Sequence, residues 1–360
     1  MTIYVLLAVS IATLWTFFSV GRLSKRLFLI VSFTFMAIVL GCRGPLVGED
    51  TSGYLEIASI SKSMNWRQIF SSFPLSTFAN DPYGYPRQTE TVYLAFNKLI
   101  MLITNNSQLV LMICAAVTCF FFGRYIYDDS RDVGESTWLF LCESLFMFGF
   151  NGMRQLMAMS LAVQFYSCFK RGRYVRGFVW IAVAAIFHTS CIFFFVVALL
   201  YVISRSGKTY RIAAVCCLLW PLVYSAISTA VAAFFPRYAL YTQVSYWQSS
   251  LGGFAILLAI LVAAILFFGF QRHKNQDDRF LHSCALLYIA LELVAQRYST
   301  LSRVALVPRA FLLFFYPCVL ARIKSPGIRT LAFMALNGAV FLLFLATASS
   351  PARLYVPFWV

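Results

Sequence analysis

One arginine and one glutamine lie inside one of the most apolar stretches of this chain. Between Trp138 and Phe169 nearly every residue is apolar or small, yet Arg154 and Gln155 stand near the middle. A charged group at membrane depth is costly, and it usually faces a water-filled cavity, a charged ligand or a partner side chain. The alternative is an arginine that reaches from a helix end to the membrane surface. Arg154 is therefore the first candidate for a functional residue.

Other polar residues gather at the ends of further apolar stretches. They are Arg43, Glu49 and Asp50, then His188, Thr189 and Ser190, and finally Arg297, Arg303 and Arg309. Several arginines with one histidine and few carboxylates are typical of a site for a doubly anionic group, because guanidinium forks bind phosphate oxygens in pairs. A metal-dependent diphosphate site would need a denser carboxylate cluster. The pattern favours a diphosphate ligand, although each of the last three arginines alone also fits an interfacial anchor.

His188 is the one histidine within an apolar stretch. An imidazole near the membrane surface can titrate close to ambient pH, which suits a general base that removes a proton from a sugar hydroxyl. The competing interpretation is a histidine at a helix bend, hydrogen-bonded to a backbone carbonyl. Asp50 is the alternative base.

The composition predicts a polytopic membrane protein. Hydrophobic residues make up 61% and charged residues 12% of 360 residues, and a soluble domain of this length could not cover so much apolar surface. The net charge of +16 is spread over short clusters between apolar stretches, which indicates membrane topology and argues against nucleic-acid binding.

Common cofactor and catalytic motifs are absent from the sequence. The ten cysteines show no CxxC pair and no Cys/His ligand spacing, so no metal site is predicted. There is also no Walker sequence, GxSxG elbow, HExxH or dinucleotide-binding glycine run. We expect no cofactor and no obligatory metal.

The fold class predicted is all-α, with about 12 membrane crossings and a range of roughly 10 to 13. Apolar stretches long enough to cross lie at 3–20, 26–41, 107–127, 152–169, 210–234, 251–271, 280–296, 304–321 and 328–348. Shorter candidates lie at 90–104 and 136–149, and 174–204 is either one long tilted helix or a hairpin bent near His188. No repeat or linker divides the chain, so residues 1–360 are expected to form a single transmembrane domain.

Basic clusters orient these stretches, because loops rich in lysine and arginine face the cytoplasm. The clusters are Arg22/Lys25/Arg26, Lys170/Arg171/Arg173/Arg176, Arg205/Lys208/Arg211, Arg272/Lys274/Arg279 and Arg322/Lys324/Arg329. They favour the hairpin at 174–204, and they place residues 42–89 outside as a loop with an interfacial helix. An odd number of crossings must follow that loop, so the most polar stretch, 90–104, is predicted not to span. Both termini, Arg154 and His188 then lie on the outer side.

Three short motifs resemble the EpsG-type, Wzy-like polysaccharide polymerases. The motifs are GCRGPLVGEDTSGY at 41–54, FNGMRQ at 150–155 and AIFHTS at 185–190. The matching positions are Arg43, Gly48, Asp50, Tyr54, Asn151, Arg154, Gln155, His188 and Ser190. Arg303, Arg309 and the aromatic tail 351–360 also resemble the family, whereas Glu49 stands where its pattern has a small residue. Among these, Asn151, Tyr54, Gln155, Glu49 and Ser190 are taken as substrate-binding or structural.

The resemblance implies a membrane glycosyltransferase of GT-C-like architecture in the bacterial inner membrane, with its active site facing the periplasm or exterior. Such an enzyme transfers a glycan from undecaprenyl diphosphate to a sugar hydroxyl of another lipid-linked unit, and Arg43, Arg154, Arg303 and Arg309 would hold the diphosphate. A chain-length regulator and a flippase are the protein partners expected. The main alternative is a flippase for lipid-linked oligosaccharide, which should spread its cations through the membrane depth. A ligase or acyltransferase is a second alternative.

Overall fold

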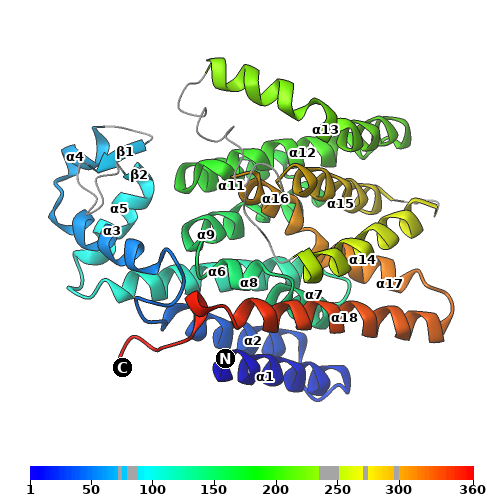
Figure 1. The fold of residues 1–360 in the computed structure, drawn as a ribbon, viewed down its shortest axis with the longest axis horizontal. Helices are drawn as coiled ribbons and strands as arrows, with labels where there is room; N and C mark the ends of the chain where they lie inside the picture. The colour runs from blue at the N-terminus through cyan, green and yellow to red at the C-terminus, as the bar shows by residue number, and fades with distance from the viewer. Residues whose placement is uncertain (72–74, 79–86, 235–250, 271–274, 296–299) are drawn as a thin grey trace. The chain divides into compact units, whose positions relative to one another are not determined.

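A computed structural model describes residues 1–71, 75–78, 87–234, 251–270, 275–295 and 300–360 of the chain (Figure 1). The described residues are predominantly helical, with one short antiparallel pair of strands. They divide into two compact units, the first formed by residues 1–192 with 344–360 and the second by 193–343. The expected single transmembrane domain stays a prediction.

The first unit holds the elements that carry the three motifs. Its helices are α1 (Thr2–Ser19), α2 (Lys25–Gly41), α3 (Thr51–Ser63), α4 (Trp66–Phe70), α5 (Thr91–Met101), α6 (Gln108–Asp129), α7 (Val133–Cys142), α8 (Leu145–Phe148), α9 (Met153–Ala162), α10 (Gln164–Lys170) and α11 (Tyr174–Phe187). The 3-10 helices η1 (Thr189–Phe193) and η3 (Pro351–Arg353) and the strands β1 (Leu75–Phe78) and β2 (Arg87–Glu90) complete the described elements. The strands pair from Leu75 opposite Glu90 to Phe78 opposite Arg87.

Helices α2 and α6 pack closely because glycines replace side chains at their contacts. A Cβ atom on Gly41 would lie 3.0 Å from the Cα atom of Met112, and one on Gly123 would lie 3.2 Å from the ring of Phe33. The pair forms one side of the unit's core.

Helix α9, which carries Arg154, is surrounded by protein. Apart from Arg154, every residue from Met153 to Ala162 is buried. A helix that is apolar on all sides can face either lipid or a protein core, and here the core surrounds it. The stretch 152–169, expected as one span, consists of α9 and α10 with a break at Val163.

The segment 42–89 contains two helices, and its place outside the membrane with an interfacial helix stays a prediction. Its amphipathic part forms α3 and α4, and α4 begins with a reciprocal capping box between Asn65 and Gln68. Capping satisfies two backbone donors that the first helical turn would leave without partners. The strands β1 and β2 follow, and β2 ends at Glu90, immediately before α5.

The second unit consists of α12 (Phe194–Ile203), α13 (Gly207–Phe234), α14 (Leu251–Phe270), α15 (Gln276–Ala295), α16 (Thr300–Arg309), α17 (Leu312–Ala321) and most of α18 (Pro326–Ala348). Polar contacts connect these helices. The side chain of Gln276 donates a hydrogen bond to the carbonyl oxygen of Tyr201 at 2.7 Å. Asp278 on α15 forms an ion pair with Arg322, which directly follows α17.

The membrane-spanning candidates are fewer than the sequence predicts. Within the described residues, length and composition select α1, α6 and α18, with α16 and α17 as a fourth, broken span bent by 45°. Helix α5 has 11 residues, about 16 Å at 1.5 Å per residue, so it is too short to cross, as expected for 90–104. Several apolar helices therefore fit a membrane protein, while the count of about 12 crossings stays a prediction.

Candidate functional site

Glu90 joins the two residues that the sequence analysis placed first. Its Oε2 atom lies 2.9 Å from Nη1 of Arg154, and its Oε1 atom lies 2.9 Å from Nδ1 of His188. The backbone N–H of Thr189 donates a hydrogen bond to the same Oε1 atom at 3.1 Å. One carboxylate thus holds a guanidinium on one side and an imidazole on the other.

Each of these three residues lies at or near the end of a helix or strand. Glu90 is the last residue of β2 and the N-cap of α5. Arg154 is the second residue of α9. Helix α11 ends at Phe187, and His188 adopts an extended conformation with φ −154° and ψ 118° before η1 begins. The predicted break at His188 is confirmed, whereas the hairpin through 174–204 involves both units and stays a prediction.

Glu90 is ionised at any physiological pH. Its side chain is 4% exposed, and burial alone raises the pKa of a carboxyl group. The imidazole of His188 and the guanidinium of Arg154 outweigh burial and lower the pKa of Glu90 to about 2. Such a carboxylate is a poor proton acceptor, so it is better suited to orienting His188 than to acting as the base itself.

The guanidinium of Arg154 is held by an aromatic ring as well as by Glu90. Its Cζ atom lies 5.5 Å from the ring centroid of Tyr93, within the range of a cation–π contact. The Arg154 side chain keeps 17% of its surface exposed. Arg154 can therefore meet a ligand without leaving Glu90.

Arg43 is a second cation of this unit, and it is completely buried. Its Nε atom donates to Oγ1 of Thr51 at 2.8 Å, and its Nη1 atom donates to the carbonyl oxygen of Leu40 at 2.6 Å. Among the described residues, Nη2 has no hydrogen-bond partner. Burial lowers the pKa of Arg43 to about 10, so the side chain stays charged at neutral pH.

The loop after Arg43 packs against the loop before Arg154. The hydroxyl of Tyr54 donates to the carbonyl oxygen of Asn151 at 3.1 Å, and the backbone N–H of Glu49 donates to Oδ1 of Asn151 at 3.4 Å. Gly48 has φ +87°, and a Cβ atom there would lie 2.2 Å from the carbonyl oxygen of Phe150. Only glycine fits this backbone conformation and this approach, which explains the first motif's glycine.

The C-terminal tail holds the same loop from another side. Backbone N–H groups of Gly44 and Gly48 donate to the carbonyl oxygens of Val356 and Ala352, at 2.7 Å and 2.6 Å. The N–H of Phe358 donates to the carbonyl oxygen of Cys42 at 3.1 Å. The aromatic tail is therefore a structural support of the Arg43 loop.

The chain matches a known family over most of its length. The family model described as the EpsG family matches residues 26–359, which include all three motif stretches and Glu90. The chain belongs to the EpsG family. No curated protein and no solved structure shows significant similarity to it.

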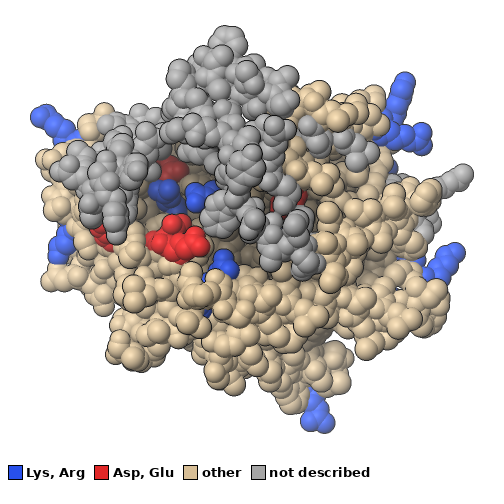
Figure 2. All heavy atoms as spheres, in the orientation of Figure 1, with Lys and Arg blue, Asp and Glu red and all other residues tan. Residues whose placement is uncertain are grey.

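The remaining predicted residues of this EpsG-family chain lie in different surroundings. Gln155 is buried beside Arg154, and Ser190 is half-buried in η1. Asp50 is the N-cap of α3, and Glu49 before it is exposed. Figure 2 shows that acidic and basic side chains gather in a recessed area near α3 and α9, while most of this face carries no charge.

Three predicted arginines belong to other parts of the sequence. Arg303 and Arg309 lie on α16 of the second unit, where the guanidinium of Arg309 lies 5.3 Å from the ring centroid of Tyr288. Their proposed place beside the diphosphate stays a prediction. Arg297 lies outside the described residues.

Glu90 is the residue that sequence reasoning missed. The sequence analysis uses only the polarity of the whole stretch 90–104, which begins at Glu90. A usable signal was present, because a buried arginine requires a compensating charge and Glu90 is an acidic residue at the start of a neighbouring apolar stretch. The pairing itself depends on how α5 and α9 lie in the fold.

Proposed function

We propose that this EpsG-family chain polymerises lipid-linked oligosaccharide units in the bacterial inner membrane, with its active site facing outward. The glycan is transferred from undecaprenyl diphosphate to a sugar hydroxyl of another lipid-linked unit. Family membership supports a polysaccharide polymerase in general. The observation that carries the finer proposal is the arrangement of Glu90 between His188 and Arg154.

His188 is the proposed base. With Nδ1 facing the Glu90 carboxylate, the favoured neutral tautomer carries its proton on Nδ1, so Nε2 is the basic nitrogen of the ring, an assignment made from the contact geometry. Nε2 takes the proton of the acceptor hydroxyl while that oxygen bonds to the anomeric carbon of the donor sugar. The bond between this carbon and the diphosphate oxygen breaks, and the proton later passes from His188 to water.

Arg154 and Arg43 are the proposed diphosphate contacts. Negative charge grows on the leaving diphosphate during the transfer, and fixed cations stabilise that charge in the transition state. Arg154 retains exposed surface, and Nη2 of Arg43 has no described hydrogen-bond partner. Arg303 and Arg309 are proposed to complete the site, and Asn151, Tyr54, Gln155, Glu49 and Ser190 to shape or bind the substrate.

The architecture belongs to the same proposal. About 12 crossings in a GT-C-like arrangement, within one transmembrane domain, would give both lipid-linked substrates access from the bilayer. A chain-length regulator and a flippase remain the proposed protein partners. Asp50 remains the alternative base, because it lies in the same loop as Arg43.

Polymer formation by purified protein tests the proposal. Wild-type chain reconstituted in liposomes with a lipid-linked repeat unit should produce long glycan and release undecaprenyl diphosphate. His188→Gln should produce none while still binding the substrate, whereas Asp50→Asn should stay active. Loss in Asp50→Asn with activity in His188→Gln would move the base to Asp50. Transport of the lipid-linked unit without glycosidic bond formation would favour a flippase.

A further inference from the structure

A second group of cations in the first unit surrounds a small polar pocket. The pocket has a volume of about 50 Å³, and its lining includes Arg124 of α6 and Gln164 and Ser167 of α10. Arg171 and Arg173, between α10 and α11, and Arg176 of α11 also line it. One arginine of α6 and three arginines at and just after the turn between α10 and α11 therefore line a space of roughly the size that a phosphate group needs. None of these residues belongs to the site around Glu90.

The pocket carries an excess of positive charge. Asp128 lies 3.6 Å from Arg124 and also 3.6 Å from Arg171, so one carboxylate serves two guanidinium groups. Arg173 and Arg176 form no ion pair with any described residue. Partly exposed pairs at this distance contribute little energy, which leaves the arginines available to an external anion.

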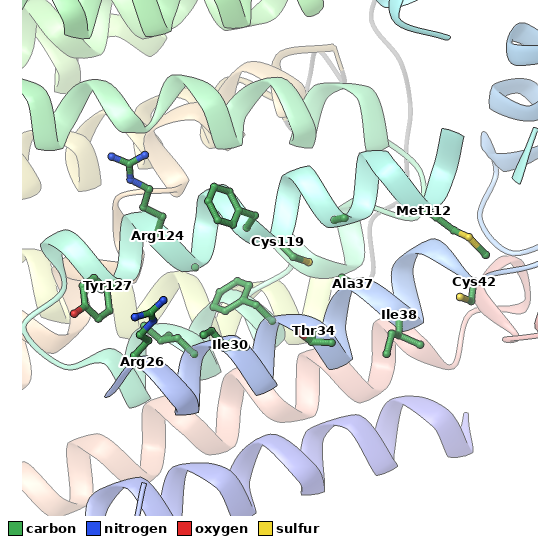
Figure 3. A pocket seen from close by; sticks show the side chains of 15 residues that line it. Arg26, Ile30, Thr34, Ala37, Ile38, Cys42, Met112, Cys119, Arg124 and Tyr127 are labelled. Carbon is green, nitrogen blue, oxygen red and sulfur yellow. The ribbon is translucent and has the colours of Figure 1, made fainter. Parts of the chain in front are cut away.

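An apolar groove adjoins this pocket. It has a volume of about 800 Å³ and runs between α2 and α6. Figure 3 shows Met112 and Cys42 at one end of the groove and Arg26 and Tyr127 at the other. Arg124 lines both the groove and the polar pocket.

The combination distinguishes a lipid from a soluble phosphate. A soluble phosphate compound needs only the arginine pocket, whereas a phospholipid offers an anionic headgroup and an apolar chain to adjacent surfaces. Helix α6 is also long and apolar enough to cross a membrane, so bilayer lipid is the available apolar ligand for a groove along it. The basic clusters are predicted to face the cytoplasm, where membrane leaflets carry anionic lipids.

We propose that the first unit binds an anionic phospholipid, with its phosphate among Arg124, Arg171, Arg173 and Arg176 and an acyl chain in the groove between α2 and α6. The groove continues to Cys42, the residue before Arg43. The lipid would thus support the helix pair that leads to the Arg43 loop. This inference does not depend on the proposed polymerase activity.

Native mass spectrometry of the purified full-length chain tests the proposal. The protein in detergent is titrated with phosphatidylglycerol, with phosphatidylcholine and with glycerol 3-phosphate, and the bound molecules are counted. Phosphatidylglycerol should bind more tightly than either of the other two. Glycerol 3-phosphate has the anionic group without the chains, so it separates a lipid site from a soluble phosphate site.

Variants locate the binding. Arg171→Gln with Arg176→Gln should weaken phosphatidylglycerol binding about 30-fold, because each basic residue near an anionic lipid contributes on the order of fivefold. Arg22→Gln with Arg329→Gln removes the same charge from two exposed arginines elsewhere and should change binding little. Ala116→Trp, at an exposed position in the groove, should weaken lipid binding without affecting glycerol 3-phosphate.

Several results would overturn the proposal. Equal affinity for phosphatidylglycerol and phosphatidylcholine would exclude a headgroup site, and equal affinity for glycerol 3-phosphate would indicate a soluble phosphate ligand. An equal loss of phosphatidylglycerol affinity in the pocket variant and in its charge-matched control would show that the overall charge of the protein, and not the pocket, attracts the lipid. If the pocket variant does not fold, lipid binding by the wild-type protein is measured at low and high salt instead. Its preference for phosphatidylglycerol over phosphatidylcholine should disappear at high salt.

Discussion

Two ion pairs in this protein have almost the same burial and differ in their surroundings. The side chains of Arg154 and Glu90 are 17% and 4% exposed, and those of Arg322 and Asp278 are 19% and 1% exposed. Glu90 also meets the imidazole of His188 and the backbone N–H of Thr189. Both guanidinium groups also lie over an aromatic ring, that of Arg154 at 5.5 Å from the centroid of Tyr93 and that of Arg322 at 4.5 Å from the centroid of Phe268.

We interpret the Asp278–Arg322 pair as structural and propose that the Glu90–Arg154 pair is functional. The Asp278–Arg322 pair belongs to the second unit and to a basic cluster predicted to face the cytoplasm, and we interpret it as an anchor of its helices. The Glu90–Arg154 pair adds a titratable imidazole at a break in the chain. Burial alone does not distinguish the two pairs, whereas the titratable imidazole beside Glu90 does.

The two ion pairs should differ most in their effect on activity when the carboxylate of each is neutralised. Glu90→Gln removes the group that orients His188, and general-base function typically contributes about 10²- to 10⁴-fold, so polymer formation should fall by that factor. Asp278→Asn should reduce the amount of folded protein without lowering activity per folded molecule. The amount of polymer formed, measured on gels and divided by the amount of folded protein, gives the activity per folded molecule of each variant. Equal specific loss in the two variants would contradict the distinction.

Replacing the arginine of each ion pair should give a smaller difference in transfer rate between the two pairs. Arg154→Lys keeps the charge and loses the fork that can hold Glu90 and a diphosphate together, so transfer should fall about 10- to 100-fold, the worth of one charged hydrogen bond. Arg322→Lys should leave the specific rate unchanged. Rates from reconstituted liposomes at saturating substrate provide the measurement, and a normal rate in Arg154→Lys would exclude the bidentate role.

Sequence reasoning located the motif residues because buried charges and chain breaks leave clear traces in an apolar sequence. Arg154, His188 and the Arg43 loop stand out in this way, and the structure brings the Arg43 loop beside Asn151, and His188 and Arg154 together through Glu90. The pairing with Glu90 depends on three-dimensional contacts between distant segments. Hydropathy also cannot tell a lipid-facing helix from one inside a protein core, which is why α9 and α10 differ from the single span expected at 152–169.

Backbone geometry should give a moderate effect on stability. Gly48 has a left-handed backbone conformation, and Gly48→Ala places a Cβ atom against the carbonyl oxygen of Phe150. We therefore expect the free energy of unfolding to fall by about 3 kcal/mol or more. Gly21→Ala is the matched control, since Gly21 has φ +75° with no atom within 4 Å of the added Cβ. This substitution should lower the free energy of unfolding by about 1 kcal/mol. Thermal unfolding in detergent compares them. Equal losses would mean that the Arg43 loop can shift to accept the Cβ atom.

The smallest expected effect is a pH dependence. The pKa of folded Glu90, about 2, is below its unfolded value near 4.3, so its stabilising contribution is complete above about pH 5 and decreases as pH falls toward 2. The wild-type melting temperature should therefore fall more steeply than that of Glu90→Gln between about pH 5 and pH 3. Parallel curves would show that Glu90 is not held ionised by His188 and Arg154.

A double-mutant cycle of Glu90→Gln and His188→Gln tests the central claim most directly. Residues that act as one catalytic unit have strongly non-additive effects on rate. If Glu90 works by orienting His188, the double variant should transfer glycan no more slowly than His188→Gln alone, measured in reconstituted liposomes and normalised to folded protein. Losses in rate that multiply, so that the double variant is slower by the product of the two single effects, would contradict the account.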